Sequence, residues 1–333
     1  MDVRIRRNET NLGASESRNR GMQESAADWI HFLDDDIVPQ SNLLLRVEQA
    51  IRDSPNAAGF VGRSNFPRSD TIFTTAVRLA GVVFFWDIAT NLDLANDVPW
   101  GVTANLVVHR KIDLKDDIFF DTSFPKTGGG EDIEFCRRKR EFSIQQLGGK
   151  GFIARPDIVV SHPWWNNGTR SYRRFYMWAY GDGALVKRFP DLTYGDLPNS
   201  AELFLVWVLG FGMAVACGNK ALSIWFLKAI LLTVTANVVH DCYRHIWKHP
   251  DRYVNMPPSL RRVAWLVAVI ESSLIRMASE MGRLHGIIAR GEVQLFGKRF
   301  DWFTGRLPTA ATEERMNNFG RLSLLFVLLA AST

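Results

Sequence analysis

Two groups of acidic residues are the part of this sequence best suited to chemistry. The first is the run of three acids at residues 34–36, which follows the apolar and aromatic stretch 29–33, and the second is Glu131 with Asp132. Adjacent carboxylates repel one another unless a cation lies among them, and their oxygen atoms suit Mg²⁺ or Mn²⁺. Acids at a helix start are also favoured by the helix dipole alone. A solvated turn and a metal site both remain open for residues 34–36.

The elements around the first acidic group predict an α/β fold. Residues 29–33 form a short apolar run that Pro39 closes, which is typical of a buried strand. In open α/β sheets the carboxyl ends of the strands face the ligand site. A helical pattern at 43–51 and strand patterns at 59–62 and 99–108 follow. This alternation predicts a largely parallel sheet.

The second acidic group follows a flexible loop. Glycines at 128–130 allow the backbone to approach a ligand closely, and Glu131 and Asp132 are expected in the first helical turn after them. A strand at 158–161 is expected to end at His162, which is more commonly a structural histidine than a ligand. Arginines at 170–174 alternate with aromatic residues, an arrangement that suits a diphosphate, although aromatic residues at helical spacing more commonly form core.

The composition restricts the class of protein. The chain has 333 residues, of which 47% are hydrophobic and 23% charged, and this excludes a disordered tail. Its net charge of +5 is spread along the chain, which fits a membrane surface or phosphate ligands and not a nucleic-acid-binding arm. Three scattered cysteines predict neither disulfides nor zinc.

Two apolar stretches predict a membrane hairpin. Residues 203–217 are uncharged, and residues 222–239 contain Lys228 as their single charge, which costs about 2.5–3.5 kcal/mol at mid-span. Basic residues at 173–188 and 244–262 flank the hairpin, so the positive-inside rule predicts an integral, multi-pass protein with a cytosolic catalytic domain. Residues 263–281, which include Glu271 and Arg276, are either a third span or an interfacial helix.

Four stretches in the first half of the chain together resemble family 2 glycosyltransferases with the GT-A fold. Residues 11–19 resemble the N-x-G-x-x-x-A-R-N stretch, with Ser17 in place of its alanine, and residues 32–36 resemble the DxD motif. Residues 129–135 resemble the acceptor-side ED motif, and residues 170–175 loosely resemble a (Q/R)xxRW element. The DxD motif alone is weak, whereas the motifs in this order and at this separation are specific.

The resemblance, together with the changes in composition along the chain, predicts a division into four parts. These are a GT-A-like domain at residues 1–190, a linker at 191–202, membrane helices at 203–290 with the hairpin at 203–239, and a C-terminal segment at 291–333 with an apolar run at 322–331. The resemblance covers about residues 8–190.

The resemblance also implies an inverting transfer of a sugar from a nucleotide-sugar, commonly a UDP-sugar, to a hydroxyl acceptor. Asp34 and Asp36 would hold Mg²⁺ or Mn²⁺ across the diphosphate. Asp132 would be the general base, and Glu131 would hold the acceptor or tune that base. The resemblance also implies that the nucleotide is contacted by Asn11, Arg18, Asn19 and Asp34. Arg173 or Arg174 would bind the diphosphate, and His162 would ligate the metal ion. Trp100 would form a platform for the sugar, for which core packing is the alternative.

The chain departs from the family's pattern at its start. The family's domain opens with a strand, a helix and a second strand that ends in an acidic turn for the nucleoside, whereas Met1 stands almost at the third strand. About thirty residues of a βαβ unit are therefore expected to be missing, which leaves a sheet edge unpaired. An inactive remnant or pseudoenzyme and a membrane scaffold without turnover are the alternatives. If the chain is active, the hairpin favours a lipid-linked or polysaccharide acceptor.

Overall fold

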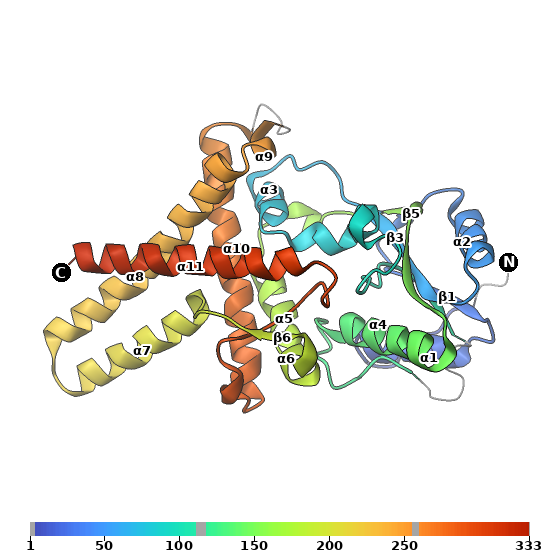
Figure 1. Ribbon diagram of the computed structural model, residues 1–333, viewed down its shortest axis with the longest axis horizontal. Coiled ribbons are helices and arrows are strands. Elements are labelled where there is room, and N and C mark those ends of the chain that lie inside the picture. Colours follow the sequence, from blue (N-terminus) through green and yellow to red (C-terminus); the bar gives the residue numbers. More distant parts are fainter. Residues whose placement is uncertain (1–3, 111–117, 255–259, 333) are drawn as a thin grey trace. The chain divides into compact units, whose positions relative to one another are not determined.

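The protein consists of two compact units. The computed structural model describes residues 4–110, 118–254 and 260–332 (Figure 1). Unit 1 comprises Met1–Pro67 and Phe84–Pro163, and unit 2 comprises Arg68–Val83 and Trp164–Thr333. Each unit is described by itself, and the four-part division expected from the sequence stays a prediction.

Unit 1 is built around a five-stranded sheet of order β1-β4-β3-β5-β2. The strands are β1 (Trp29–Leu33), β2 (Val38–Pro39), β3 (Ala57–Asn65), β4 (Asn105–His109) and β5 (Lys150–Ser161). The central pair β3 and β5 is parallel, whereas β4 is antiparallel to both β1 and β3, and β2 is antiparallel to β5.

The expectation of a mostly parallel sheet is therefore wrong for the pairing of neighbouring strands. The α/β class is correct, but the described sheet is mixed, and β3 with β5 is its parallel pair. The reason is that β4 inserts between β1 and β3 and runs against both. Its sequence does not reveal this direction, because a strand buried on both faces is apolar throughout whichever way it runs.

Helices cover both faces of this sheet. They are α1 (Ala14–Glu24), α2 (Leu43–Asp53) and α4 (Glu131–Glu141). Leu43 and Val47 of α2 pack against Phe60 of β3 in one cluster, which Trp29 of β1 joins. Phe32 of β1 instead lies edge-on to Phe135 of α4. Trp29 and Phe32 are an odd number of residues apart, so the two-residue period of a strand places them on opposite faces.

Unit 2 is mainly helical. Its longer elements are α3 (Ile72–Leu79), α5 (Arg173–Asp182), α7 (Ser200–Ala216), α8 (Lys220–Cys242), α10 (Val263–Ala289) and α11 (Pro308–Ala331), and its short ones are α6 (Leu185–Arg188), η8 (Tyr243–Lys248), α9 (Asp251–Val254) and the antiparallel pair β6 (Thr193–Gly195) and β7 (Lys298–Phe300). The segment 191–202 thus contains β6 and the first turn of α7, where a linker is expected from the sequence.

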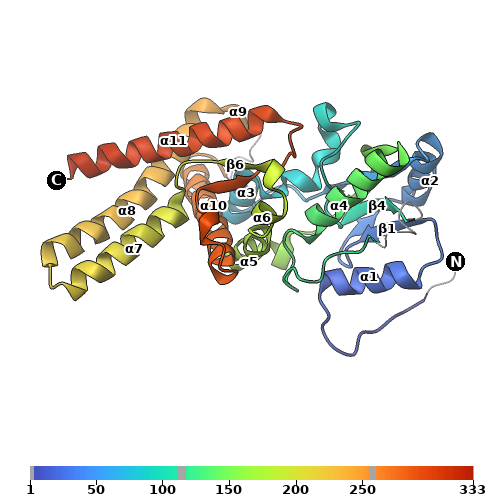
Figure 2. The ribbon, with the colours of Figure 1, turned by 60° about the horizontal axis from the view of Figure 1, so that its bottom comes forward.

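Three apolar helices of unit 2 lie side by side. α8 contacts both α7 and α11, and the three helices run in a similar direction in the view of Figure 2. Ala229 and Ala236 of α8 pack with Leu325 and Leu329 of α11 in the core of this bundle. Alanines at the contact let the helix axes approach closely. Trp207 of α7 adds a hydrogen bond from its indole nitrogen to Thr233 Oγ1, 3.0 Å away.

One helix of the described residues, Lys220–Lys248, is long and apolar enough to cross a membrane, and Ser200–Ala216 is a shorter apolar helix. The expectation of a multi-pass protein is therefore not supported. The candidate third span, α10, contains two buried acids, Glu271 and Glu280, among its apolar residues.

A network of four charged side chains joins α8, α10 and α11. Asp241 lies 3.0 Å from Arg276 Nη2 and 2.9 Å from Arg321 Nη2, and Arg276 Nη1 lies 2.6 Å from Glu280. Glu280 also accepts a hydrogen bond of 3.0 Å from the backbone nitrogen of Ser200. We call these four residues the unit 2 quartet. Its two acids and two arginines cancel in charge.

Candidate active site

The end of β1 and the end of β5 bring together three groups that could hold a metal ion. His162 Nε2 lies 3.7 Å from Asp34 Oδ2 and 3.8 Å from Asp36 Oδ1. One ligand atom from each residue lies within 4.8 Å of the others. These three residues are called the acidic triad below. Asp35, the middle acid of the sequence run, is exposed and does not belong to the triad.

The backbone fixes the position of His162. Its backbone nitrogen donates to the carbonyl of Asn65 at 2.8 Å, which extends the parallel pairing of β5 with β3 by one residue. Its ring stacks on Phe66, with centroids 4.8 Å apart. The imidazole is 1% exposed, whereas the side chains of Asp34 and Asp36 are 37% and 48% exposed. A rigid nitrogen ligand thus faces two carboxylates that solvent or a substrate can reach.

The tautomer of His162 suits metal ligation. Nδ1 lies 2.7 Å from the carbonyl oxygen of Pro163, and since a carbonyl can only accept, this geometry assigns the proton to Nδ1. The lone pair of Nε2 then faces Asp34 and Asp36. A ligating histidine commonly donates its other ring N–H to a backbone carbonyl in this way. Two carboxylates with one imidazole form a donor set that Mn²⁺ or Mg²⁺ can use.

The two acids also shift the titration of the histidine. Burial by itself would lower the pKa of His162, but the contact with Asp34, the hydrogen bond to Pro163 and the charge of Asp36 outweigh burial, so this pKa is raised above its ordinary value. The site therefore attracts a positive charge, which either a proton or a metal ion could supply.

The second acidic group lies at the start of α4, as the sequence predicts. Gly128, Gly129 and Gly130 have φ angles of 84°, 110° and 90°, which residues with a Cβ rarely adopt. This loop lets the backbone nitrogen of Gly129 donate to Glu131 Oε2 at 2.7 Å, and Arg18 Nη1 lies 3.2 Å from Glu131 Oε1. Glu131 is thus buried and held at both oxygens, whereas the neighbouring Asp132 is partly exposed.

Two other residues proposed to contact the nucleotide, Asn11 and Asn19, differ in their exposure to solvent. Asn19 is buried, and its side-chain amide makes two hydrogen bonds with the backbone of Phe120, at 2.8 and 2.7 Å. Asn11 is exposed and accepts from the backbone nitrogen of Gly13 at 2.9 Å, within the turn before α1. Asn19 therefore holds α1 to the segment around Phe120, while Asn11 remains accessible.

Trp100 packs inside unit 1. It is 5% exposed and stacks on Phe85, with ring centroids 4.2 Å apart. A sugar platform needs an open ring face, which a buried and stacked indole does not offer. The core-packing alternative fits this environment.

Arg173 and Arg174 belong to unit 2, so the structure fixes no distance between them and the acidic triad. Arg173 is exposed at the start of α5. The guanidinium of Arg174 lies over the rings of Trp165 and Trp178, 5.8 and 5.5 Å from their centroids.

Two features of the site were not anticipated from the sequence. Phe66 supports the histidine ring, but a phenylalanine after a strand carries no sign of that role. The pairing of Arg18 with Glu131 joins residues 113 positions apart. Their opposite charges and their two motifs are the only signals of that pairing in the sequence, and neither indicates contact.

Comparisons with known proteins found similarity over part of the chain. Residues 1–113, about a third of the chain, match the model of "Glycosyl transferase family 2". A protein of Haemophilus influenzae named "Uncharacterized glycosyltransferase" is 48% identical over 54 residues, which is 16% of this chain and 18% of that protein. The chain therefore matches less than a fifth of that relative's length. The family match includes Asp34 and Asp36, while Asp132 and His162 lie beyond it. Together these findings show that residues 1–113 are similar to family 2 glycosyl transferases and that a stretch of 54 residues is similar to a protein named a glycosyltransferase.

Proposed function

We propose that this chain transfers a sugar from a nucleotide-sugar, with a UDP-sugar as the donor to test first, to a hydroxyl acceptor with inversion and with a divalent metal ion. The observation that carries this proposal is the convergence of Asp34, Asp36 and His162. Two of these residues lie within the family match, and the third is brought to them by the pairing of β2 with β5, in which Val38 lies opposite Ser161.

The acidic triad would hold Mg²⁺ or Mn²⁺. Asp34 and Asp36 would offer carboxylate oxygens, and His162 would offer Nε2. When bound, the ion would neutralise charge on the departing diphosphate, so that no protein acid is needed at the leaving group. The partial exposure of both carboxylates supports this role, because the donor's diphosphate must reach the same ion.

Asp132 would act as the general base. Its carboxylate would take the proton of the acceptor hydroxyl, whose oxygen forms a bond to the anomeric carbon as the bond from that carbon to the diphosphate breaks. The attack and the departure occur on opposite faces of the sugar, which inverts its configuration. The nucleoside diphosphate leaves with the electron pair of the broken bond.

Arg18 and Glu131 would support this base. Because Glu131 is held by Arg18 and by the backbone of Gly129, it fixes the first turn of α4 from which Asp132 projects. We therefore propose Arg18 as a positioning residue and Asn19 as a structural one. Asn11 remains a candidate contact for the nucleotide.

The long apolar helix Lys220–Lys248, which begins with α8, would anchor the chain in a membrane, with α7 packed against it. Val206, Leu209 and Met213 of α7 and Ile224 and Leu231 of α8 are all more than half exposed, an arrangement that costs free energy in water and none in hydrocarbon. An anchored catalytic domain on the cytosolic side suits an acceptor that is lipid-linked or a membrane-associated polysaccharide.

The test is a screen of UDP-sugars with and without Mn²⁺, in which release of UDP is measured for the unaltered chain and for Asp132→Asn. We expect turnover to fall by about 10²- to 10⁴-fold in the variant, with metal-dependent UDP binding retained. Asp93→Asn makes the same chemical change at an exposed carboxylate of unit 1 and should keep full activity. Unchanged turnover in Asp132→Asn would refute the assignment of the base. Binding of UDP and Mn²⁺ without turnover of any donor would instead support the pseudoenzyme.

A further inference from the structure

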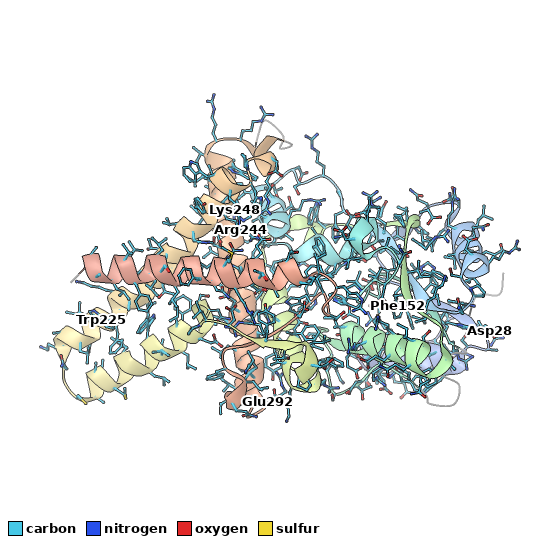
Figure 3. The ribbon with its side chains drawn as sticks, viewed as in Figure 1. Asp28, Phe152, Trp225, Arg244, Lys248 and Glu292 are labelled. Atoms are coloured by element: carbon cyan, nitrogen blue, oxygen red, sulfur yellow. The ribbon has the colours of Figure 1, made fainter. Side chains whose placement is uncertain are left out.

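A cluster of basic side chains lies in unit 2 where α8 ends. It consists of Arg244, Lys248, His249 and Arg252, and we call it the basic cluster. Arg244 and Lys248, labelled in Figure 3, are one helical turn apart. Three of its members face the same oxygen atom, Glu313 Oε1 of α11, at 3.3 Å for Arg244, 4.0 Å for Lys248 and 3.9 Å for His249.

The cluster carries more positive charge than its acids neutralise. Arg252 donates from Nη1 to Nδ1 of the buried His245 at 2.8 Å, which requires an unprotonated nitrogen on that histidine. Burial and the charge of Arg244 lower the pKa of Arg252, and Asp251 and Glu313 are the acids that oppose this shift. Arg244, Lys248 and Arg252 therefore face two carboxylates. Burial and the arginine charges also lower the pKa of His249, so this side chain adds little charge of its own at neutral pH.

Two exposed aromatic residues lie where the apolar surface of α8 gives way to this cluster. Leu231 and Val239 of α8 are 67% and 47% exposed, and next come Tyr243 and Trp247, which are 54% and 68% exposed. Exposed aromatic residues of this kind are enriched at the boundary between membrane and water. Arg244 follows Val239 by five residues, or about 8 Å of helix, which is close to the thickness of one headgroup layer.

We propose that the basic cluster binds the phosphate of an anionic phospholipid at the membrane surface. From α8 into η8 an apolar surface gives way to aromatic residues that alternate with basic ones, which matches hydrocarbon followed by the interface and its headgroups. Glu313 holds Arg244 and Lys248 towards one point, and a lipid phosphate would supply the negative charge that Glu313 and Asp251 leave unmet. The proposal rests on the membrane insertion of α8 proposed above, but not on the sugar-transfer chemistry.

The experiment uses the full chain purified in detergent. Thermal unfolding is measured during titration with dioctanoyl phosphatidylglycerol, with dioctanoyl phosphatidylcholine and with inorganic phosphate. A ligand that binds only the folded chain raises its unfolding temperature by an amount that grows with the logarithm of its concentration relative to its dissociation constant, so the titration yields that constant. We expect phosphatidylglycerol to raise this temperature at concentrations at which the other two compounds have no effect.

Variants then locate the binding site. The triple change Arg244→Gln, Lys248→Gln and Arg252→Gln should weaken the affinity for phosphatidylglycerol by about a hundredfold, since each basic residue near an anionic membrane surface contributes about 1 kcal/mol. Lys248→Gln alone, at a side chain that is 42% exposed, should weaken it by about fivefold and is expected to leave the fold intact.

A matched control removes three positive charges from unit 1, through Arg46→Gln, Arg52→Gln and Lys150→Gln, and should respond as the unaltered chain does. Equal responses to the two lipids, an equal loss in the control, or replacement of phosphatidylglycerol by inorganic phosphate at the same concentration would each overturn the proposal. Retention of the chain in carbonate-washed membranes tests insertion separately. Loss of retention would therefore contradict the anchor, while loss of lipid selectivity alone would contradict the basic cluster.

Discussion

The acidic triad of unit 1 and the quartet of unit 2 each bring two carboxylates to basic side chains, but the two groups differ in net charge and in exposure. In the triad, two carboxylates meet one histidine, and both carboxylates remain more than a third exposed. In the quartet, Asp241 and Glu280 meet Arg276 and Arg321, and none of the four side chains is more than 19% exposed. A surplus of negative charge at an accessible place suits a cation, whereas cancelled charge at an inaccessible place suits a structural role.

The largest effect is expected from Asp36→Asn. Loss of a metal ligand removes several kcal/mol of charge stabilisation at the leaving group, so turnover with Mn²⁺ should fall by about a thousandfold. The free energy of unfolding of the metal-free chain should stay the same or rise slightly, because one of two repelling acids is neutralised. Steady-state kinetics and denaturant titration of the same preparation check both parts. A loss of stability above 2 kcal/mol would contradict the contrast with the quartet.

Replacement of an aspartate by asparagine in the quartet of unit 2 should instead lower the free energy of unfolding. Asp241→Asn leaves Arg276 and Arg321 without their shared acid, and removal of one partner from a buried ion pair costs about 3–5 kcal/mol. Denaturant unfolding of the full chain measures this cost. The double variant Asp241→Asn with Arg321→Gln should recover part of the loss, because it restores the cancellation of charge. A cost below 1 kcal/mol for the single variant would show that the quartet does not stabilise unit 2.

A smaller effect is expected from Asn19→Ala, which tests whether Asn19 stabilises unit 1 or contacts the nucleotide. Asn19→Ala leaves the backbone N–H and C=O of Phe120 without their partners and should cost about 1–3 kcal/mol of stability. The affinity of the remaining folded protein for UDP should not change, as titration calorimetry can establish. Asn11→Ala, at an exposed turn, serves as the control, with a cost below about 1 kcal/mol. Lost affinity in Asn19→Ala at unchanged stability would return Asn19 to the nucleotide site.

The smallest effect concerns pH. The pKa of His162 is raised in the folded chain, so the stability that its protonated ring contributes is complete below about pH 6.5 and is lost as pH rises through the raised pKa. Binding of Mn²⁺ needs the unprotonated ring and should therefore strengthen over that same rise in pH. Thermal unfolding from pH 5 to 9, with and without Mn²⁺, checks both trends. If His162→Gln retains both pH dependences, the histidine is not their source.

Local patterns were sufficient to predict several parts of unit 1. An apolar run before residues 34–36 predicted β1, and three glycines before Glu131 predicted the turn into α4, since both depend on neighbouring residues. The strand that ends at His162 followed from its β-branched residues. These predictions concern backbone conformations that a few adjacent side chains determine.

Features that depend on long-range contacts were not predictable in the same way. The antiparallel insertion of β4, the burial of Trp100 against Phe85 and the pairing of Arg18 with Glu131 each join distant segments. The charges of α10 illustrate the same limit. Glu271 and Arg276 looked like interruptions of a membrane span, whereas Arg276 joins the quartet and Glu271 accepts a 2.9 Å hydrogen bond from Tyr172.

The most direct test of the central claim is a titration of the full chain with Mn²⁺, followed by electron paramagnetic resonance of the free ion. We predict one site in the presence of UDP, and we expect affinity to fall at least tenfold in Asp34→Asn, in Asp36→Asn and in His162→Gln. Asp93→Asn should bind as the unaltered chain does. Equal Mn²⁺ affinity in all four variants would contradict the assignment of the acidic triad as a metal site.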